Sequence, residues 1–180
     1  MKEVEIKAKA PDADALKRKL EEKGCEFSEP AVQKDRIYLH EDTSFPEITR
    51  GTVILRIRET KGKHILTLKK QLGNELDNIE REVTVDDPDQ AEDILTHMDY
   101  REAVRVRKTR TTCSYKDMEI CIDEVDRLGT FIEVEKMTEE DSATVQEELF
   151  SFLETLGVRK EDQVHKGYDT LTYELNHKDL

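Results

Sequence analysis

The chain has 180 residues and a formal net charge of −13 at pH 7, with 36% hydrophobic and 39% charged residues. This length fits a single domain over residues 1–180, and the acidic balance argues against a protein that binds nucleic acid or an anionic membrane. No apolar run approaches the roughly 20 residues needed to cross a bilayer, and the apolar residues recur periodically, which indicates a folded chain.

The N-terminal segment predicts one strand followed by one helix. Residues 2–10 alternate between charged and apolar side chains, which is typical of a β-strand with one apolar face. Pro11 and Asp12 then begin a helix, and Gly24 ends it, because glycine readily adopts the left-handed conformation that follows a helix.

From residue 31 onward the pattern is mostly that of strands. We expect strands at 32–40, 51–60, 63–70, 78–86, 100–110, 112–116, 118–124 and 130–137. A short helix is expected at 89–97 and a longer amphipathic helix at 139–156. The tail at 161–175 should form a short helix or turn around Tyr168.

The expected elements indicate the fold class. Most strands are joined by short turns, which favours antiparallel pairing. About nine strands with three or four helices indicate an α+β protein whose sheet closes, or nearly closes, into a barrel. The chain has no long Pro, Gly or Ser linker and no convincing internal repeat that would divide it.

Charged residues occur two positions apart on nearly every expected strand, so they share one face. These faces carry Glu3, Glu5, Lys7, Arg56, Arg58, Lys69, Glu80, Glu82, Lys108, Arg110, Asp123, Glu133 and Glu135, and only Lys69, which follows Thr67, and Asp123, which follows Cys121, have no charged neighbour two positions away. One interpretation is a solvated sheet face with opposite charges paired across strands. The other is a barrel with apolar faces outside, beneath the helices, and charged faces inside. Because Val104 and Val106 share the parity of Lys108 and Arg110, the second interpretation requires a β-bulge in 100–110.

An interior of mixed charge suits a complex of a divalent metal with a triphosphate. Arg and Lys neutralise phosphate oxygens, and Arg does so with two parallel hydrogen bonds. Carboxylates hold Mg²⁺ or Mn²⁺, which bridge carboxylate and phosphate oxygens. Phosphoryl transfer needs mainly positioning and charge neutralisation, which such an interior could supply.

A series of short motifs follows the same strands. They are EVEIK at 3–7, QKDRIYL at 33–39, LRIR at 55–58, LTLK at 66–69, EREV at 80–83, KTR at 108–110, IDEVDRLGTFIEVE at 122–135, and a tail with Tyr168. In this order they resemble the CYTH superfamily, which is named for class IV adenylyl cyclases and thiamine triphosphatases. The likeness covers nearly the whole chain and is greatest to the prokaryotic CyaB-like branch.

The resemblance implies a triphosphate tunnel, which is a closed eight-stranded antiparallel barrel with helices packed outside and a linear triphosphate along its axis. The basic positions that it implies for triphosphate binding are Lys7, Arg56, Arg58, Lys69, Lys108 and Arg110. The acidic positions that it implies for Mg²⁺ or Mn²⁺ are Glu3, Glu5, Glu80, Glu82, Asp123, Glu133 and Glu135. Glu5, Glu133 and Lys7 are the expected catalytic residues, whereas alternation turns Arg81 away from the interior.

Four functions remain open. A class IV adenylyl cyclase would convert ATP to cyclic AMP and pyrophosphate, and the CyaB-like resemblance favours this reaction. A triphosphatase would hydrolyse tripolyphosphate, thiamine triphosphate or a nucleoside triphosphate. A non-catalytic module would bind nucleotide or polyphosphate without turnover, and a structural barrel would bind neither. A triphosphate-containing small molecule is the expected partner, and the resemblance is compatible with a homodimer.

The remaining polar residues carry no second signal. Cys25, Cys113 and Cys121 are odd in number and lack CxxC spacing, which predicts reduced, packed thiols rather than disulfides or a zinc site. The five histidines show no metal-ligand spacing. The N-terminus lacks the apolar segment of a signal peptide, so we expect a cytoplasmic protein.

Overall fold

The computed structural model describes residues 2–45 and 47–178. Its strands are β1 (Lys2–Lys9), β2 (Ala31–His40), β3 (Val53–Thr60), β4 (Lys63–Gln71), β5 (Asp77–Val85), β6 (Tyr100–Tyr115), β7 (Met118–Val125), β8 (Gly129–Thr138) and β9 (Gln163–Val164). Its helices are α1 (Ala13–Glu22), α2 (Pro88–His97), α3 (Ser142–Thr155) and α4 (Tyr168–Asn176), with a 3₁₀ turn at Lys160–Asp162. None of the helices in the described part of the chain is long and apolar enough to cross a membrane.

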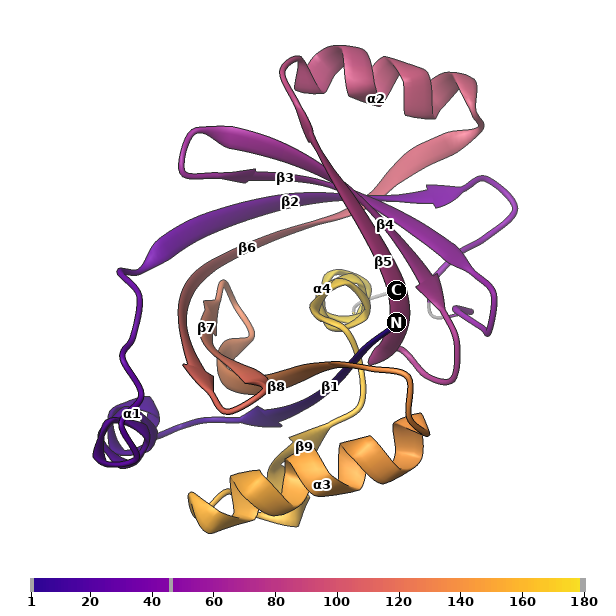
Figure 1. The fold of residues 1–180 in the computed structure, drawn as a ribbon. Coiled ribbons are helices and arrows are strands. Elements are labelled where there is room, and N and C mark those ends of the chain that lie inside the picture. The colour runs from indigo at the N-terminus through magenta and orange to yellow at the C-terminus, as the bar shows by residue number, and fades with distance from the viewer. Residues whose placement is uncertain (1, 46, 179–180) are drawn as a thin grey trace.

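The strands form one antiparallel sheet in the order β5-β4-β3-β2-β6-β7-β8-β1-β9. The sheet closes because β1 also pairs with β5, where Glu3 lies opposite Asn78 and Val4 opposite Asp77. Figure 1 shows the ring of strands with α1, α2 and α3 around it. The expected α+β class, with a closed eight-stranded antiparallel barrel and helices packed outside, is confirmed.

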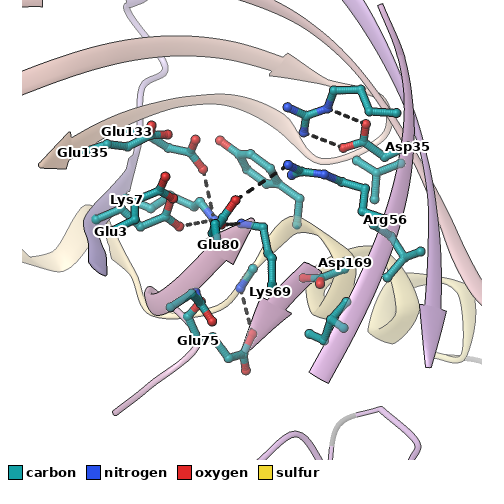
Figure 2. A pocket seen from close by; sticks show the side chains of 18 of the residues that line it. Glu3, Lys7, Asp35, Arg56, Lys69, Glu75, Glu80, Glu133, Glu135 and Asp169 are labelled. Atoms are coloured by element: carbon teal, nitrogen blue, oxygen red, sulfur yellow. Dashed lines mark hydrogen bonds and ion pairs between the residues drawn. The ribbon is translucent and has the colours of Figure 1, made fainter. Parts of the chain in front are cut away.

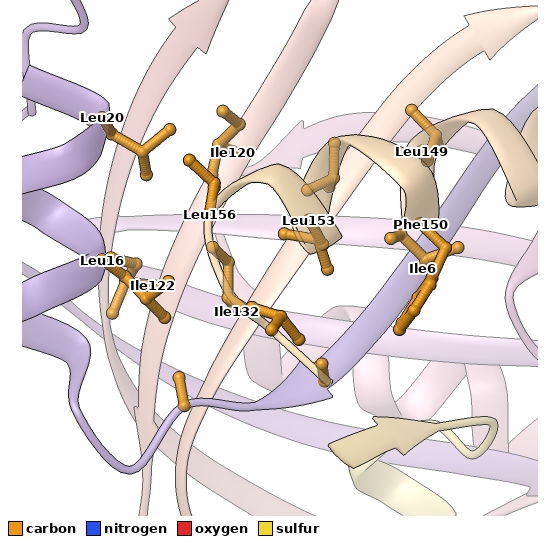
Figure 3. Close-up of a cluster of buried hydrophobic side chains, with 14 of the residues drawn as sticks. Ile6, Leu16, Leu20, Ile120, Ile122, Ile132, Leu149, Phe150, Leu153 and Leu156 are labelled. Carbon is orange, nitrogen blue, oxygen red and sulfur yellow. The ribbon is translucent and has the colours of Figure 1, made fainter. Parts of the chain in front are cut away.

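Two helix layers cover the outer, apolar face of the barrel. On one side, α1 and α3 pack against β1, β7 and β8, and residues such as Ile6, Ile132 and Leu153 are almost fully buried (Figure 3). On the other side, Leu95 of α2 packs in a cluster that includes Ile57. Each such side chain stabilises the fold by roughly 1.5–3 kcal/mol through its burial. Because the apolar faces point outward, the charged faces must point inward.

Strand β6 differs from the expectation of two separate strands at 100–110 and 112–116. It runs without a break from Tyr100 to Tyr115, because its first part pairs with β2 and its last part pairs with β7. A bulge does lie within 100–110, at Ala103, where the register with β2 shifts, but it does not separate Val106 from Lys108, so the expectation that a bulge must do so was wrong. Val106 therefore keeps the inward direction of Lys108, and both side chains line the barrel interior.

Helix α4 confirms the expected helix in the tail and covers the inner apolar residues of β6. In Figure 1 it is seen along its axis in the middle of the ring of strands, and it contacts β6. Tyr168 packs in one cluster with Val106 and Phe131, and Tyr173 packs against Phe45 at a ring-centroid distance of 5.3 Å. The apolar residues at this end of the interior are therefore shielded by the C-terminal segment.

Candidate functional site

A cavity of about 410 Å³ lies inside the barrel. Twelve of the thirteen charged residues singled out in the sequence line it, namely Glu3, Glu5, Lys7, Arg56, Arg58, Lys69, Glu80, Glu82, Lys108, Arg110, Glu133 and Glu135. Figure 2 shows several of these side chains pointing toward one another from different strands. The interpretation with apolar faces outside is therefore the correct one, and the alternative of a solvated charged face is wrong.

Asp123 is the exception, because it is fully buried and does not line the cavity. Its carboxylate accepts hydrogen bonds from Lys108 Nζ at 3.0 Å and from Arg110 Nε and Nη2 at 2.7 and 2.6 Å. This geometry makes Asp123 an anchor for two cations of the lining. Its expected role as a metal ligand stays a prediction.

Strand pairing brings the acidic cluster together. In the register between β1 and β8, Glu5 lies opposite Glu135 and Lys7 lies opposite Glu133. Lys7 Nζ lies 3.2 Å from Glu133 Oε1 and 3.9 Å from Glu5 Oε1. The carboxylates of Glu5, Glu133 and Glu135 offer oxygens that all lie within 4.8 Å of one another. Such a set of hard oxygen donors fits Mg²⁺ or Mn²⁺.

Burial and crowding shift the pKa values in this cluster in opposite directions. Burial raises the pKa of Glu3 to about 9 and the pKa of Glu5 to about 7, and the neighbouring Glu133 carboxylate adds to the shift at Glu5. Burial alone would also raise the pKa of Glu133, but Lys7 and Arg110 hold it well below its usual range. At neutral pH the ionised Glu133 therefore lies near Glu3, which keeps its proton, and Glu5, which is partly protonated, and a divalent cation would take the place of those protons.

The other side of the cavity holds a second network of paired charges. Arg56 donates hydrogen bonds to Thr67 Oγ1 and Glu82 Oε1, both at 3.2 Å. Lys69 forms an ion pair with Glu80, and Figure 2 shows both residues beside Arg56. As alternation predicted, Arg81 is exposed and points away from the cavity.

Asp35 is a lining residue that the sequence reasoning missed. Its carboxylate accepts two hydrogen bonds from the Arg58 guanidinium, at 2.7 and 2.8 Å. Burial alone would raise the pKa of Asp35, but the Arg58 hydrogen bonds and charge lower it to about 2. A signal was present, because Asp35 is a charged residue on an expected strand, but its neighbours two positions away, Gln33 and Ile37, are uncharged.

Residues outside the main strands also line the cavity. Glu75, from the connection between β4 and β5, lies there together with Tyr168 and Asp169 at the start of α4. Figure 2 shows Glu75 and Asp169 near Lys69. Period-two alternation could not find these residues, because it describes strands and not loops or helix ends.

The three cysteines are free and buried, as expected. Cys121 points inward from β7, and its Sγ lies 3.9 Å from an oxygen of Glu119 and from an oxygen of Glu135. Burial raises the pKa of the Cys121 thiol far above its usual value, which disfavours a nucleophilic thiolate. Glu119 lines the cavity without having been given a role from the sequence.

Comparisons with known proteins agree with this geometry. The family model described as the CYTH domain matches residues 1–168. A Methanocaldococcus jannaschii protein named as a putative adenylate cyclase is 30% identical over 175 residues, which cover 93% of this chain and 97% of that protein.

Two solved structures share the fold. The PH1819 protein of Pyrococcus horikoshii has a TM-score of 0.77 and 29% identity, and the match covers 97% of this chain and 98% of that one. A Hippeastrum protein, named as a putative adenylyl cyclase with a dominant triphosphatase activity, has a TM-score of 0.60 and 18% identity. That match covers 93% of this chain and 91% of the Hippeastrum chain.

Proposed function

This chain belongs to the CYTH family, and we propose that it is a metal-dependent enzyme that binds a linear triphosphate in the barrel cavity and hydrolyses it. The observation that supports this function is the convergence of six Lys or Arg side chains and ten carboxylates on one cavity. A barrel that was only structural would not need to bury so many charges, since their removal from water is costly.

The charge balance of the lining indicates that metal and triphosphate bind together. Carboxyl groups exceed Lys and Arg residues by four, and by three when Glu3, with a pKa of about 9, keeps its proton, so a polyanion alone would meet net repulsion. Glu5, Glu133 and Glu135 would hold Mg²⁺ or Mn²⁺, with Glu3 and Glu80 nearby. When bound, the metal supplies charge neutralisation for phosphate oxygens.

The chain's own residues have three roles in this proposal. Phosphate oxygens are bound by the positive charges of Arg56, Lys69 and Arg110. Because these side chains lie on different walls of the cavity, they also orient the phosphate chain. The Lys7 ammonium neutralises charge next to the acidic cluster. The Glu5 carboxyl, whose pKa burial raises to about 7 in the absence of metal, loses its proton to hold the metal together with Glu133 and Glu135.

Adenylyl cyclase activity is the second candidate, and the name of the M. jannaschii relative favours it. In that reaction the ribose 3′-hydroxyl of ATP attacks the α-phosphorus, so the protein must also hold an adenosine group. Tyr168 is the aromatic residue among the described residues of the lining, and its ring is already in contact with two lysines. Because charged side chains dominate the lining, hydrolysis of the phosphate chain is the better supported reaction.

One experiment separates these candidates. The protein is incubated with Mg²⁺ or Mn²⁺ and with ATP, tripolyphosphate or thiamine triphosphate in parallel, and cyclic AMP, pyrophosphate and orthophosphate are measured. Orthophosphate without cyclic AMP is the expected result, whereas cyclic AMP with pyrophosphate would assign the cyclase. Tight binding without any product would indicate a non-catalytic module, and no binding would overturn the proposal.

A further inference from the structure

Tyr168, the first residue of α4, brings an aromatic ring to the two lysines at the inner end of the cavity. Lys7 Nζ lies 4.0 Å from the ring centroid, and Lys108 Nζ lies 4.7 Å from it. The ring also packs edge-on against Phe131 at a centroid distance of 5.2 Å, and Tyr168 is only 8% exposed. Two ammonium groups near one ring are attracted by its π-electrons, which holds their positions.

The hydroxyl of Tyr168 has no hydrogen-bond partner among the described residues, although it is buried. Buried polar groups are nearly always paired, so an unpaired one at the wall of a charged cavity calls for a partner that enters the cavity. Burial raises the pKa of Tyr168 well above its usual value, and the nearby charged groups are those of Glu133, Asp123, Arg110 and Glu5. The hydroxyl therefore keeps its proton at neutral pH and can act as a donor.

Contacts from distant parts of the chain fix the position of Tyr168. The backbone N–H of Gly167 and the hydroxyl of Thr170 each donate to Glu75 Oε2 at 2.8 Å. Lys7 Nζ donates to the carbonyl of Lys166 at 3.1 Å. The residues on either side of Tyr168 are thus bound to the barrel, so its hydroxyl is held in a defined place.

We propose that Tyr168 completes the triphosphate site from the C-terminal helix: its ring positions Lys7 and Lys108, and its hydroxyl donates a hydrogen bond to a phosphate oxygen of the bound chain. The inference rests on the proposed function and adds a donor that no strand supplies. A phosphate oxygen is a suitable acceptor because it is charged, and Arg110 and Lys7 would draw it to this end of the cavity.

The test compares Tyr168→Phe and Tyr168→Leu with the wild type. Binding of a non-hydrolysable imido analogue of tripolyphosphate is measured by calorimetry with Mg²⁺ present, and Tm is measured in parallel. A hydrogen bond to a charged acceptor predicts that Tyr168→Phe weakens binding about 10-fold or more. Its Tm should stay the same or rise, because it loses only an unpaired buried hydroxyl. Tyr168→Leu should weaken binding further, since it also loses the ring.

Tyr115→Phe is the matched control, because Tyr115 stacks on Phe152 outside the cavity. This variant should bind the analogue as tightly as the wild type does. Equal affinity of Tyr168→Phe and wild type would overturn the inference while the proposed function stands. If Tyr168→Phe lowered Tm and affinity together, the role of the Tyr168 hydroxyl would be merely structural, and the inference would also be overturned. Failure of the wild type to bind would instead overturn the proposed function, and the inference with it.

Discussion

The guanidinium of Arg58 donates two hydrogen bonds to the carboxylate of Asp35 inside the barrel, so its planar donor group is occupied without any ligand. The sequence suggested Arg58 as a phosphate contact. In the structure it is one half of a buried ion pair at the cavity wall. A triphosphate could recruit Arg58 only by competing with Asp35, just as it would have to compete with Asp123 for Arg110.

Asp35→Asn should lower the free energy of unfolding at neutral pH. The pKa of Asp35 in the folded protein is about 2, below the ordinary value of 3.8. The ionised carboxylate therefore adds to the free energy of unfolding above pH 4, and this stabilisation is lost as the pH falls toward 2. The expected contribution is about 2 kcal/mol. Urea unfolding of both proteins from pH 7 to pH 2 measures it.

The matched control for this prediction is Glu59→Gln, which removes the exposed partner of Lys34 on the same pair of strands. That substitution should change stability little, since exposed ion pairs contribute little. A difference between Asp35→Asn and wild type that persisted unchanged at pH 2 would contradict the assignment.

Asp123→Asn should reduce triphosphate affinity without reducing Mg²⁺ affinity. Asp123 accepts hydrogen bonds from Lys108 and Arg110, so its loss leaves two buried cations less well held. Breaking a buried pair of this kind lowers stability by about 3 kcal/mol. Calorimetric titration with Mg²⁺ alone, followed by tripolyphosphate, separates the two effects. Loss of Mg²⁺ binding at an unchanged Tm would make Asp123 a metal ligand instead.

The sequence was sufficient to place the inward charges because a strand in a closed barrel has only two faces. Once the apolar residues around Ile6 belong beneath helices, Glu5 and Lys7 have only the interior left. The same parity argument correctly separated Arg81 from Glu80 and Glu82. These are local properties, so they can be read from alternation alone.

The pairing of those charges could not be read in the same way. Asp35 meets Arg58 only because β2 and β3 pair in a register that places them opposite each other. Tyr168 reaches the cavity only because Glu75 binds the start of α4. Both relationships join segments that are distant along the chain, and a local pattern contains no information on their register or docking.

Glu5→Gln and Glu133→Gln should both abolish metal-dependent turnover in folded protein. In the absence of metal, the two substitutions should change the stability of the protein in opposite directions. Burial raises the pKa of Glu5 from 4.5 to about 7, so its cost to folding grows between these pH values and is fully present at pH 8, where Glu5→Gln should raise Tm by at least about 2 °C. Glu133→Gln should lower Tm, because Lys7 and Arg110 lose their ionised partner. Unchanged turnover in both variants would refute the metal assignment.

Mg²⁺ affinity should fall as the pH decreases below about 7. Glu5 must be ionised to bind a cation, and with a pKa of about 7 it is increasingly protonated below that value. Binding at pH 6.5 should therefore release protons, which calorimetry detects as an enthalpy that depends on the ionisation heat of the buffer. An enthalpy independent of the buffer would show that no protonated carboxyl takes part.

Arg56→Ala should weaken tripolyphosphate binding about 10-fold or more, while Arg81→Ala should leave it unchanged. Arg56 lies on β3 and faces the cavity, whereas Arg81 lies on β5 and is exposed on the outside. Arg56→Lys keeps the charge and loses the planar pair of donors, so its affinity should fall between those of wild type and Arg56→Ala. Calorimetry with the imido analogue and Mg²⁺ measures all three. If Arg81→Ala weakened binding as much as Arg56→Ala does, net charge rather than contact inside the barrel would govern affinity.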